Sequence, residues 1–340
     1  MRAVIEQWLL AAWQRDSAWL IVLRPLSAVY GWLAARRRKQ QSATAAAALP
    51  VVVVGNITVG GSGKTPLLIA IAEQLAELGW HPGIVSRGYG GQSADYPLLV
   101  TAAIGAEQCG DEPRLIADRT ALPVMVDPDR RRAVAALVEQ CGVNLVLSDD
   151  GLQHYRMART VEIVVVDGER QFSNQRLLPA GPLREPLARL ESVDLVVING
   201  GQHCPQVANA SAMQLAPGPL RALNRAAQAT QLQAPTAVHA VAAIGNPQRF
   251  ASTLQKLGFD VQLHGAADHA PLSAAELCFD DGQPVVVTEK DAVKLSPELR
   301  DGVSNPLWVL PVNALLVDTF WQQLTVLLGA APVPETRSNP

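Results

Sequence analysis

The amino-acid sequence predicts an α/β fold: a mostly parallel sheet flanked by helices, with a second, smaller α/β domain. The first indication is a β-branched run at residues 51–54, which is typical of a strand buried on both faces of a parallel sheet. The second is the alternation of further apolar runs with helical patterns such as residues 130–139. These runs lie at residues 83–85, 122–126, 145–147, 161–166 and 195–198.

The third indication is a stretch at residues 224–235 that is rich in Gln and Ala and carries little pattern. A second set of apolar runs follows it, so we expect a smaller domain to begin near this point. The strands of that domain are expected near residues 238–244, 259–263, 285–287 and 307–310.

Composition narrows the class of protein. A chain of 340 residues with 49% hydrophobic and 17% charged residues can bury a large core. The formal net charge is −3, but the first forty residues alone carry seven basic and two acidic side chains, which leaves −8 for the remainder. A basic end on an acidic body favours contact with anionic lipid and argues against nucleic-acid binding. The four cysteines form no C-x-x-C motif, so we expect neither a zinc site nor disulfides.

The N-terminal segment is apolar but interrupted. Charged residues at 15–16 and 24 divide residues 3–33 into runs shorter than the roughly twenty residues that a spanning helix needs, and no cleavable signal peptide is indicated. We expect helices that lie in the membrane interface, because aromatic rings and a basic cluster at 36–39 are typical of such helices. A helix packed on the protein's own core is the alternative. The aromatic residues are Trp8, Trp13, Trp19, Tyr30 and Trp32.

A glycine-rich loop follows the first buried strand, and a helical pattern at residues 67–75 follows the loop. Glycines let successive backbone N–H groups point at phosphate oxygens, and the helix N-terminus adds a partial positive charge. Lys64 is expected to reach the outer phosphates and Thr65 to ligate Mg²⁺. Thr58 occupies the first glycine position of the pattern G-x-x-x-x-G-K-[ST], so this P-loop is a variant. The predicted nucleotide-binding residues are Thr58, Val59, Gly60, Gly61, Ser62, Gly63, Lys64 and Thr65.

An acidic pair, Asp149 and Asp150, ends the apolar run at 145–147. P-loop enzymes carry a magnesium-orienting aspartate at the end of such a strand, so both residues are candidates for the site. The alternative is that one of them is an ordinary turn residue before Gly151.

A polar cluster with Lys290 and Asp291 follows the apolar run at 285–287, where P-loop proteins of the GTPase group place a base-reading Lys-x-Asp. The spacing here differs. These two residues are candidates for contacting adenine or closing a cleft, and a plain turn is the alternative.

Several motifs occur together in a fixed order. They are Gly-Asn-Ile-Thr-Val-Gly-Gly-Ser-Gly-Lys-Thr-Pro at 55–66, Ser-Arg-Gly-Tyr-Gly at 86–90, Gly-Asp-Glu-Pro at 110–113, Asp-Asp-Gly-Leu-Gln-His at 149–154, Leu-Pro-Ala-Gly-Pro-Leu-Arg-Glu at 178–185, Ala-Ile-Gly-Asn-Pro at 243–247, Asp-His at 268–269 and Thr-Glu-Lys-Asp at 288–291. This combination resembles the tetraacyldisaccharide 4′-kinases of lipid A biosynthesis, over nearly the whole chain.

The resemblance implies phosphorylation, by ATP with Mg²⁺, of the 4′-hydroxyl of a tetraacylated glucosamine disaccharide 1-phosphate. Such a lipid stays in the bilayer, since extraction into water costs about 0.8 kcal/mol per methylene group. An interfacial anchor suits that substrate. The expected location is therefore the cytoplasmic face of the inner membrane, as a peripheral or monotopic protein, with membrane lipids as partners and no obligatory protein partner.

The resemblance also implies roles for individual residues. Asp111 is the candidate base, paired with His269 in a dyad whose members could tune each other's protonation. Without the resemblance, Asp111 would be taken for part of an acidic helix start and His269 for a surface residue. Lys64 is also assigned to the catalytic group. The candidate metal ligands are Thr65, Glu112, Asp149, Asp150 and Glu185, and the candidate substrate contacts are Arg87, Tyr89, Gln153, His154 and Arg184.

The expected organisation is a membrane-surface anchor at 1–34, a P-loop kinase domain at 35–225, a smaller α/β domain at 226–330 and a tail at 331–340. Catalysis would then occur between the domains, with closure bringing His269 to Asp111. Deletion of residues 1–34 is expected to release the protein from vesicles and leave nucleotide binding intact. Two other classes stay open: a membrane-attached GTPase-like switch or metallochaperone, and a non-catalytic adaptor. Nucleotide preference, ATP or GTP, would separate kinase from switch.

Overall fold

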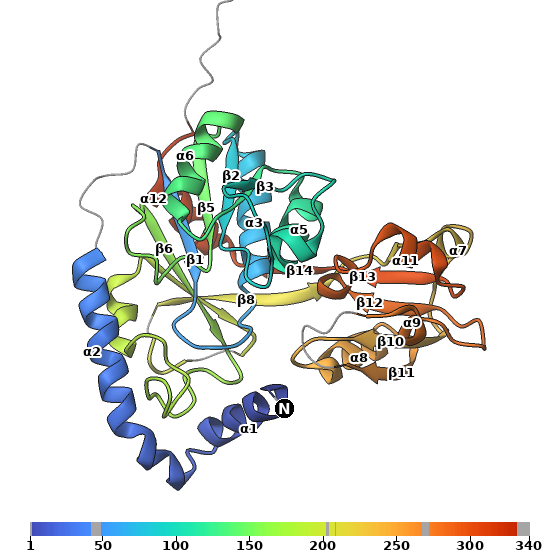
Figure 1. Ribbon diagram of the computed structural model, residues 1–340, viewed down its shortest axis with the longest axis horizontal. Helices are drawn as coiled ribbons and strands as arrows, with labels where there is room; N and C mark the ends of the chain where they lie inside the picture. Colours follow the sequence, from blue (N-terminus) through green and yellow to red (C-terminus); the bar gives the residue numbers. More distant parts are fainter. Residues whose placement is uncertain (1, 42–48, 202–203, 208, 267–271, 332–340) are drawn as a thin grey trace, which may run out of the picture.

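The structure is a computed structural model that describes residues 2–41, 49–201, 204–207, 209–266 and 272–331. Within these ranges the strands β1 to β14 form a nine-stranded sheet and a five-stranded sheet, each in its own lobe (Figure 1). His269 and the predicted tail from residue 332 onward lie outside the described residues, so the predictions about them stay predictions.

The larger sheet has the order β14-β8-β7-β6-β1-β5-β2-β4-β3. Neighbours from β8 to β4 are all parallel, and only the edge strands β14 and β3 pair antiparallel. The predicted α/β class with a mostly parallel sheet is thereby confirmed. The strands are β1 (Val51–Gly55), β2 (Pro82–Ser86), β3 (Leu98–Leu99), β4 (Val124–Val126), β5 (Leu145–Asp149), β6 (Val161–Asp167), β7 (Leu195–Asn199), β8 (Ala210–Pro217) and β14 (Val312–Leu316).

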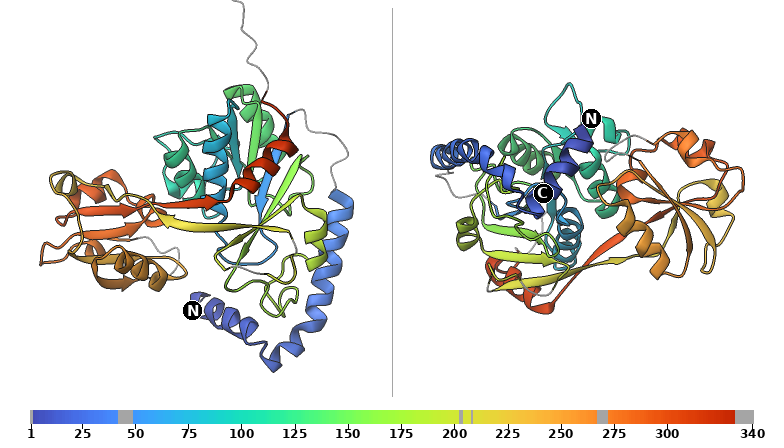
Figure 2. Two further views of the ribbon diagram at one scale, coloured as in Figure 1. Left: turned by 180° about the vertical axis from the view of Figure 1, so that it is seen from behind. Right: turned by 90° about the horizontal axis from the view of Figure 1, so that it is seen from below.

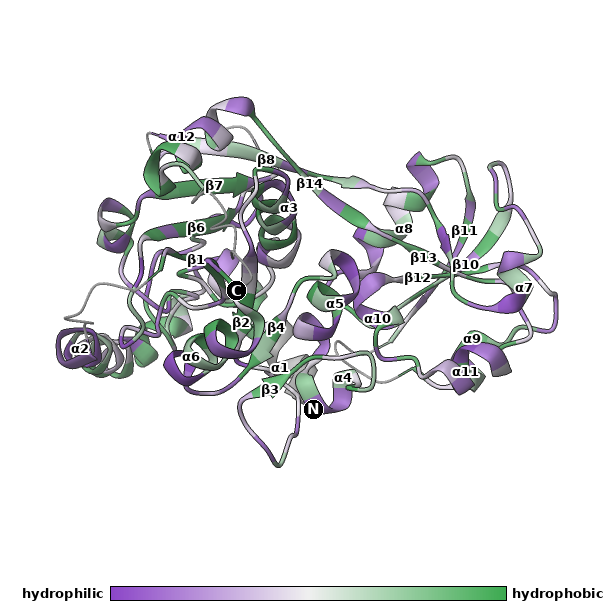
Figure 3. Ribbon diagram, turned by 90° about the horizontal axis from the view of Figure 1, so that it is seen from above, coloured by the Kyte–Doolittle hydropathy of each residue, from purple (hydrophilic) through white to green (hydrophobic). Residues whose placement is uncertain are grey.

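Helices cover both faces of this sheet, and β1 shows why. Val52 and Val54 pack with residues of α3, α5 and α12, whereas Val51 and Val53 pack with residues of α6. Each fully buried valine contributes roughly 1.5–3 kcal/mol, which explains the unbroken apolar run. Figure 3 shows apolar colouring along the strands of this sheet. The helices of this lobe are α3 (Lys64–Glu77), α4 (Ala106–Cys109), α5 (Asp111–Thr120), α6 (Arg130–Cys141), the 3-10 helix η2 (Leu187–Ser192) and α12 (Asp318–Leu328).

The smaller sheet has the order β11-β10-β12-β13-β9 and is parallel except for β9. Its strands are β9 (Arg221–Ala222), β10 (Ala237–Ala242), β11 (Asp260–Gly265), β12 (Val285–Thr288) and β13 (Leu307–Leu310). The helices in this part of the chain are α7 (Arg225–Gln228), α8 (Pro247–Lys256), α9 (Ala274–Leu277), α10 (Glu289–Ala292) and α11 (Pro297–Gly302).

The two lobes are joined by the antiparallel pair β8 and β14, which runs from one to the other (Figures 1 and 2). After β13 the chain returns to the larger lobe, where Phe320 and Leu324 of α12 enter the core beside α3. Residues 226–330 were predicted to belong entirely to the smaller domain. The structure instead assigns residues 312–328 to the larger lobe, because β14 pairs with β8.

Of the N-terminal helices, α2 lies along one side of the larger lobe and α1 lies below it in the view of Figure 1 (Figures 1 and 2). They are α1 (Arg2–Gln14), the 3-10 helix η1 (Ala18–Leu23) and α2 (Arg24–Gln41), so helix extends beyond the predicted boundary at residue 34. By length and composition the stretch Ala18–Gln41 is apolar enough to cross a membrane, a property that some core helices and signal sequences share. Most of this stretch is exposed.

Candidate active site

The phosphate loop connects β1 to α3 and is shaped by a close approach to β7. Gly63 has φ +91°, and a Cβ at this position would lie 2.5 Å from the side-chain nitrogen of Asn199. That nitrogen donates to the carbonyl oxygen of Ser62 at 3.1 Å. Glycine at 63 is therefore required twice, by its backbone conformation and by the space that Asn199 occupies.

Three side chains hold consecutive carbonyls of the loop. Asn56 Nδ2 donates to the carbonyl of Gly60 at 3.3 Å, Asn199 holds that of Ser62, and Arg170 donates to that of Gly61. Because C=O and N–H point in opposite directions across a trans peptide, each fixed carbonyl turns the N–H of the next residue the other way. Those N–H groups are the donors that a phosphate needs.

Thr58 and Val59, which were predicted to bind nucleotide, contact residues 182–183 in this structure. The N–H of Val59 donates to the carbonyl of Pro182 at 2.9 Å, and Thr58 forms a bridge with Leu183. The N–H of Val59 is thus bound to protein and is not offered to phosphate. These two residues fasten the beginning of the loop to a neighbouring segment.

Lys64, the first residue of α3, faces an acidic and basic cluster. Its Nζ lies 3.8 Å from Asp150 Oδ1, and Arg184 donates to both oxygens of Asp150 at 2.9 and 3.0 Å. Burial raises the pKa of Asp150, but the charges of Lys64 and Arg184 outweigh it, so this pKa lies below its ordinary value. Arg184, a predicted substrate contact, holds Asp150 in this structure.

Asp149 is the most unusual carboxylate of the site. It is buried, and its Oδ2 accepts a hydrogen bond from Ser86 at 3.1 Å. Its Oδ1 has no hydrogen-bond partner among the described residues. Burial, together with the negative charges of Glu112 and Asp150, raises the pKa of Asp149 to about 7. A buried carboxylate oxygen without a partner, with two further carboxylates nearby, is chemically suited to a cation.

The few protein donors at this site suit Mg²⁺, which does not require a complete cage of side chains. No group of three or more His, Cys, Asp and Glu side chains within the described ranges could hold a metal by itself. Mg²⁺ is usually bound by one or two carboxylates together with substrate phosphates and water. Asp149 and the buried hydroxyl residue Thr65 match that arrangement.

Asp111 and Glu112 begin α5, and their cationic partners come from α10 and from the turn that follows it. Lys294 Nζ lies 3.7 Å from Asp111 Oδ2, and Lys290 Nζ lies 3.1 Å from Glu112 Oε1. Burial raises the pKa of Glu112, but Lys290 and Lys64 outweigh it and lower this pKa overall. The proposed partner of Asp111, His269, lies outside the described residues.

Glu185 has all its bonds inside the protein. Gln153 donates to one of its oxygens at 2.6 Å, and the other accepts from Tyr155 and lies 3.4 Å from Arg189. This geometry favours a positioning role over the predicted metal role. Gln153 also donates to the carbonyl of Asn56 at 3.2 Å, which ties the group to the phosphate loop.

Three further predicted substrate contacts, His154, Arg87 and Tyr89, differ in their exposure to solvent. His154 is half-buried, with Nε2 at 3.9 Å from Asp129, and burial and the charge of Arg130 lower its pKa to about 4. It is neutral at pH 7. Arg87 and Tyr89 are exposed, with the Tyr89 side chain 73% accessible, so they are free to meet a large substrate.

Asp291 does not have the geometry expected of a nucleotide contact. It is fully buried and accepts from Thr288 at 2.7 Å, from the N–H of Ala243 at 3.1 Å and from Lys294 at 3.1 Å. Its role here is to fix the start of α10. Lys290 contacts Glu112, so α10 approaches the site through this lysine.

Sequence reasoning missed several residues that support the site. Arg130 is buried and donates to the carbonyl of Asp149 at 3.1 Å, at the start of a helix that the sequence predicted correctly. Asn199 ends β7, and a polar residue at the end of an apolar strand could have identified it. Tyr155 and Arg189 carried no comparable signal.

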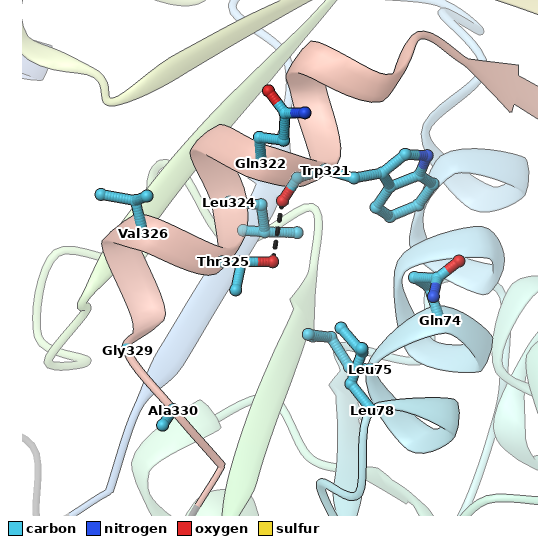
Figure 4. Close-up of a pocket in the computed structure, with 10 residues that line it drawn as sticks. All are labelled: Gln74, Leu75, Leu78, Trp321, Gln322, Leu324, Thr325, Val326, Gly329 and Ala330. Carbon is cyan, nitrogen blue, oxygen red and sulfur yellow. Dashed lines mark hydrogen bonds between the residues drawn. The ribbon is translucent and has the colours of Figure 1, made fainter.

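A pocket lies away from this site, between the end of α3 and α12. It has a volume of about 660 Å³ and is lined mostly by apolar side chains, including Leu75, Leu78 and Leu324 (Figure 4). Leu75 lies eleven residues after Lys64, so the pocket is about 17 Å along the helix axis from the phosphate loop. It is not part of the nucleotide site.

Three features together define a P-loop phosphotransferase. They are a parallel sheet, a glycine-rich loop that leads into a helix with Lys64 at its start, and a buried aspartate at the end of the adjacent strand. Comparison with known proteins identifies the family. The family model for tetraacyldisaccharide-1-P 4′-kinase matches residues 19–328, and the chain belongs to this family. It is a kinase that transfers phosphate to a sugar hydroxyl, which excludes the switch, metallochaperone and adaptor alternatives.

Curated relatives agree with this assignment. The tetraacyldisaccharide 4′-kinase of Alcanivorax borkumensis is 44% identical over 324 residues, covering 94% of this chain and 97% of its own length. That of Pseudomonas fluorescens is 45% identical over 336 residues, covering 96% and 98%. The crystal structure of LpxK from Aquifex aeolicus, an "apo" form in complex with ATP, shares the fold with a TM-score of 0.73 at 23% identity, over 91% of this chain and 99% of that chain.

Proposed function

We propose that this protein transfers the terminal phosphate of ATP to the 4′-hydroxyl of a tetraacylated glucosamine disaccharide 1-phosphate, a lipid A precursor. The observation that carries the proposal is the phosphate loop with Lys64 beside Asp150 and the unpartnered Asp149 oxygen. Membership of the family and the ATP complex of the Aquifex aeolicus protein support the choice of substrate and nucleotide.

The residues divide the chemistry between them. Lys64 and the loop amides bind the phosphates and offset their charge, which is the main requirement of phosphoryl transfer. Thr65 and Asp149 would hold Mg²⁺, whose contribution when bound is to neutralise charge on the phosphate oxygens. Asp111, with Lys294 at 3.7 Å, is proposed to accept the proton of the sugar hydroxyl, with His269 as its partner.

We further propose that the protein works at the cytoplasmic face of the inner membrane. Large apolar side chains on the outer side of the N-terminal helices support this: Val22 is 75% exposed and Trp32 59% exposed. The basic cluster at 36–39 would meet anionic headgroups. The other large apolar residues of the N-terminal helices that are exposed are Trp8, Trp19, Ile21, Leu26, Val29 and Leu33.

The test is transfer of labelled phosphate from γ-labelled ATP to a lipid A disaccharide 1-phosphate in detergent micelles. We expect Mg²⁺-dependent label at the 4′-position and little transfer from GTP. Transfer to water alone, with no labelled lipid, would contradict the proposed acceptor. For the membrane part, Trp32→Ser should weaken pelleting with anionic vesicles, and unchanged pelleting would count against it.

A further inference from the structure

The N-terminal helices bind one irregular segment of the larger lobe, residues 177–184, which we call the strap. Three polar side chains of α1 and α2 form hydrogen bonds with its backbone. Trp13 donates to the carbonyl of Pro179 at 3.1 Å, and Tyr30 donates to that of Arg184 at 3.1 Å. Ser27 donates to the carbonyl of Leu177 at 2.9 Å and accepts from the N–H of Ala180 at 3.0 Å.

The strap also binds the phosphate loop. Pro182 accepts from the N–H of Val59, the N–H of Arg184 donates to the carbonyl of Ile57 at 2.7 Å, and Leu183 bridges Thr58. The strap therefore lies between the N-terminal helices and the loop, with hydrogen bonds to both.

An apolar contact links the helices to the loop directly. Val59 packs against a small cluster whose buried members, Ala12, Trp13 and Leu20, all belong to the N-terminal segment. The fixed position of Val59 thus depends on side chains that precede the phosphate-binding domain.

The end of the strap reaches the charged centre of the site. Tyr30 holds the backbone of Arg184, whose guanidinium forms two hydrogen bonds with Asp150. Asp150 in turn lies 3.8 Å from Lys64. A displacement of the strap would change both the beginning of the loop and the partner of its lysine.

The two sides of α2 have different surroundings. Ser27 is buried and Tyr30 is half-buried against the strap, whereas Val29 and Trp32 are exposed. A spacing of three residues places the members of each pair on one helix face. The side that contacts the strap is therefore separate from the side proposed to meet lipid.

We propose that α1 and α2 position the phosphate loop through the strap, so that affinity for nucleotide depends on Ser27 and Tyr30. This inference rests on the proposed ATP-dependent function and adds a role for the N-terminal helices beyond membrane binding. An irregular segment gains its fixed conformation mainly from its contacts with neighbours, and such segments open most readily when these are lost. Deletion of the N-terminal helices should accordingly weaken nucleotide binding, contrary to the expectation from sequence.

The experiment compares Tyr30→Phe, Ser27→Ala and the double variant with the wild type and with Ala35→Ser, an exposed control on the same helix. ATP affinity is measured by calorimetry without lipid, which removes any membrane contribution, and KM and kcat are measured in micelles. We expect Tyr30→Phe to raise the Kd and KM for ATP roughly 3- to 10-fold, the usual effect of losing one hydrogen bond. Ser27→Ala removes two hydrogen bonds with the strap and should raise them at least as much. The double variant should lose more affinity for ATP than either single variant, while kcat at saturating ATP stays near the wild-type value.

Thermal unfolding and circular dichroism establish that the variants are folded at the assay temperature. Folded Tyr30→Phe and Ser27→Ala proteins with wild-type ATP affinity would overturn the inference, as would an equal loss in Ala35→Ser. A wild type that binds ATP but does not phosphorylate the lipid would overturn the proposed function alone, because calorimetry would still decide whether the helices position the loop.

Discussion

The phosphate loop and helix α10 reach the same site from different lobes, and they are held by different forces. The loop is fixed by buried amide side chains, Asn56 and Asn199, inside one sheet. Helix α10 meets α5 through ion pairs that are partly exposed, such as Lys290 with Glu112. Buried neutral hydrogen bonds are insensitive to salt, whereas exposed ion pairs are weak and screened. The contacts that hold the phosphate loop are thus insensitive to salt, whereas the Lys290–Glu112 contact between the lobes is screened by it.

One contact between the lobes departs from this pattern. Glu289, at the start of α10, is buried and accepts from Arg119 at 2.8 and 2.9 Å and from the N–H of Val312 at 3.0 Å. Arg119 also donates to Asn313 of β14 at 2.6 Å. This buried contact beside the β8–β14 connection would keep the lobes together while the exposed pairs open.

The largest effect is expected at the loop. Lys64→Ala removes the charge nearest the transferred phosphate, so kcat should fall by about 10³-fold or more. Steady-state transfer of labelled phosphate measures this, with Lys256→Ala, an exposed lysine of α8, as the control. A loss of less than tenfold in folded Lys64→Ala protein would show that the lysine is not at the reacting phosphate.

The second effect concerns the buried contact between the lobes. Glu289→Ala leaves Arg119 buried without its carboxylate, which should lower the free energy of unfolding by about 3 kcal/mol. Chemical denaturation measures the change, and Glu139→Ala, at an exposed position of α6, is the control. If both variants unfold at the same denaturant concentration, the contact does not hold the lobes together.

The third effect is the pH dependence set by Asp149, whose pKa is raised to about 7. The stability that its bound proton contributes is present below the unfolded pKa and is lost as the pH rises through about 7. Below pH 7, Mg²⁺ must displace this proton in order to bind. The stabilisation of the fold by Mg²⁺ should therefore fall by up to about 1.4 kcal/mol for each pH unit below 7.

Thermal unfolding with and without Mg²⁺ at pH 6 and pH 8 tests this. The increase in Tm caused by Mg²⁺ should be larger at pH 8, and Asp149→Asn should remove the difference. An equal increase at both pH values in the wild type would show that Asp149 does not bind the ion.

The smallest effect is expected at the exposed ion pair. Lys290→Ala removes the partner of Glu112, but the two side chains are 37% and 32% accessible, so the free energy of unfolding should fall by less than about 1 kcal/mol. At about 1 M salt the difference from the wild type should disappear. A larger decrease in the free energy of unfolding that persists at high salt would contradict the interpretation of this ion pair as weak and screened.

The parts of the site that the sequence predicted are those encoded by neighbouring residues. The loop, its helix and the acidic pair after β5 follow from local patterns, because strand, glycines and lysine must be consecutive. The paired arginine of Asp150 and the support of Gly63 by Asn199 join residues far apart in the chain, and no local pattern specifies them.

The return of the chain to the larger lobe could not be predicted either, because it too depends on contacts between residues far apart in the sequence. Residues 312–316 form a strand of ordinary composition, and only pairing with β8 assigns them to the larger sheet. Glu185 was predicted as a metal ligand only from the resemblance to the kinase family. Its actual partners, Tyr155 and Arg189, are fixed by packing.

The central claim is that the loop beginning α3 encloses the phosphates of ATP together with Mg²⁺. Titration calorimetry of ATP into the folded wild-type protein, with Mg²⁺ and with chelator, tests it most directly. The account predicts saturable binding that requires Mg²⁺ for full affinity and is strongly weakened in Lys64→Ala. Heat signals that are absent, or identical in the wild type and Lys64→Ala, would contradict it.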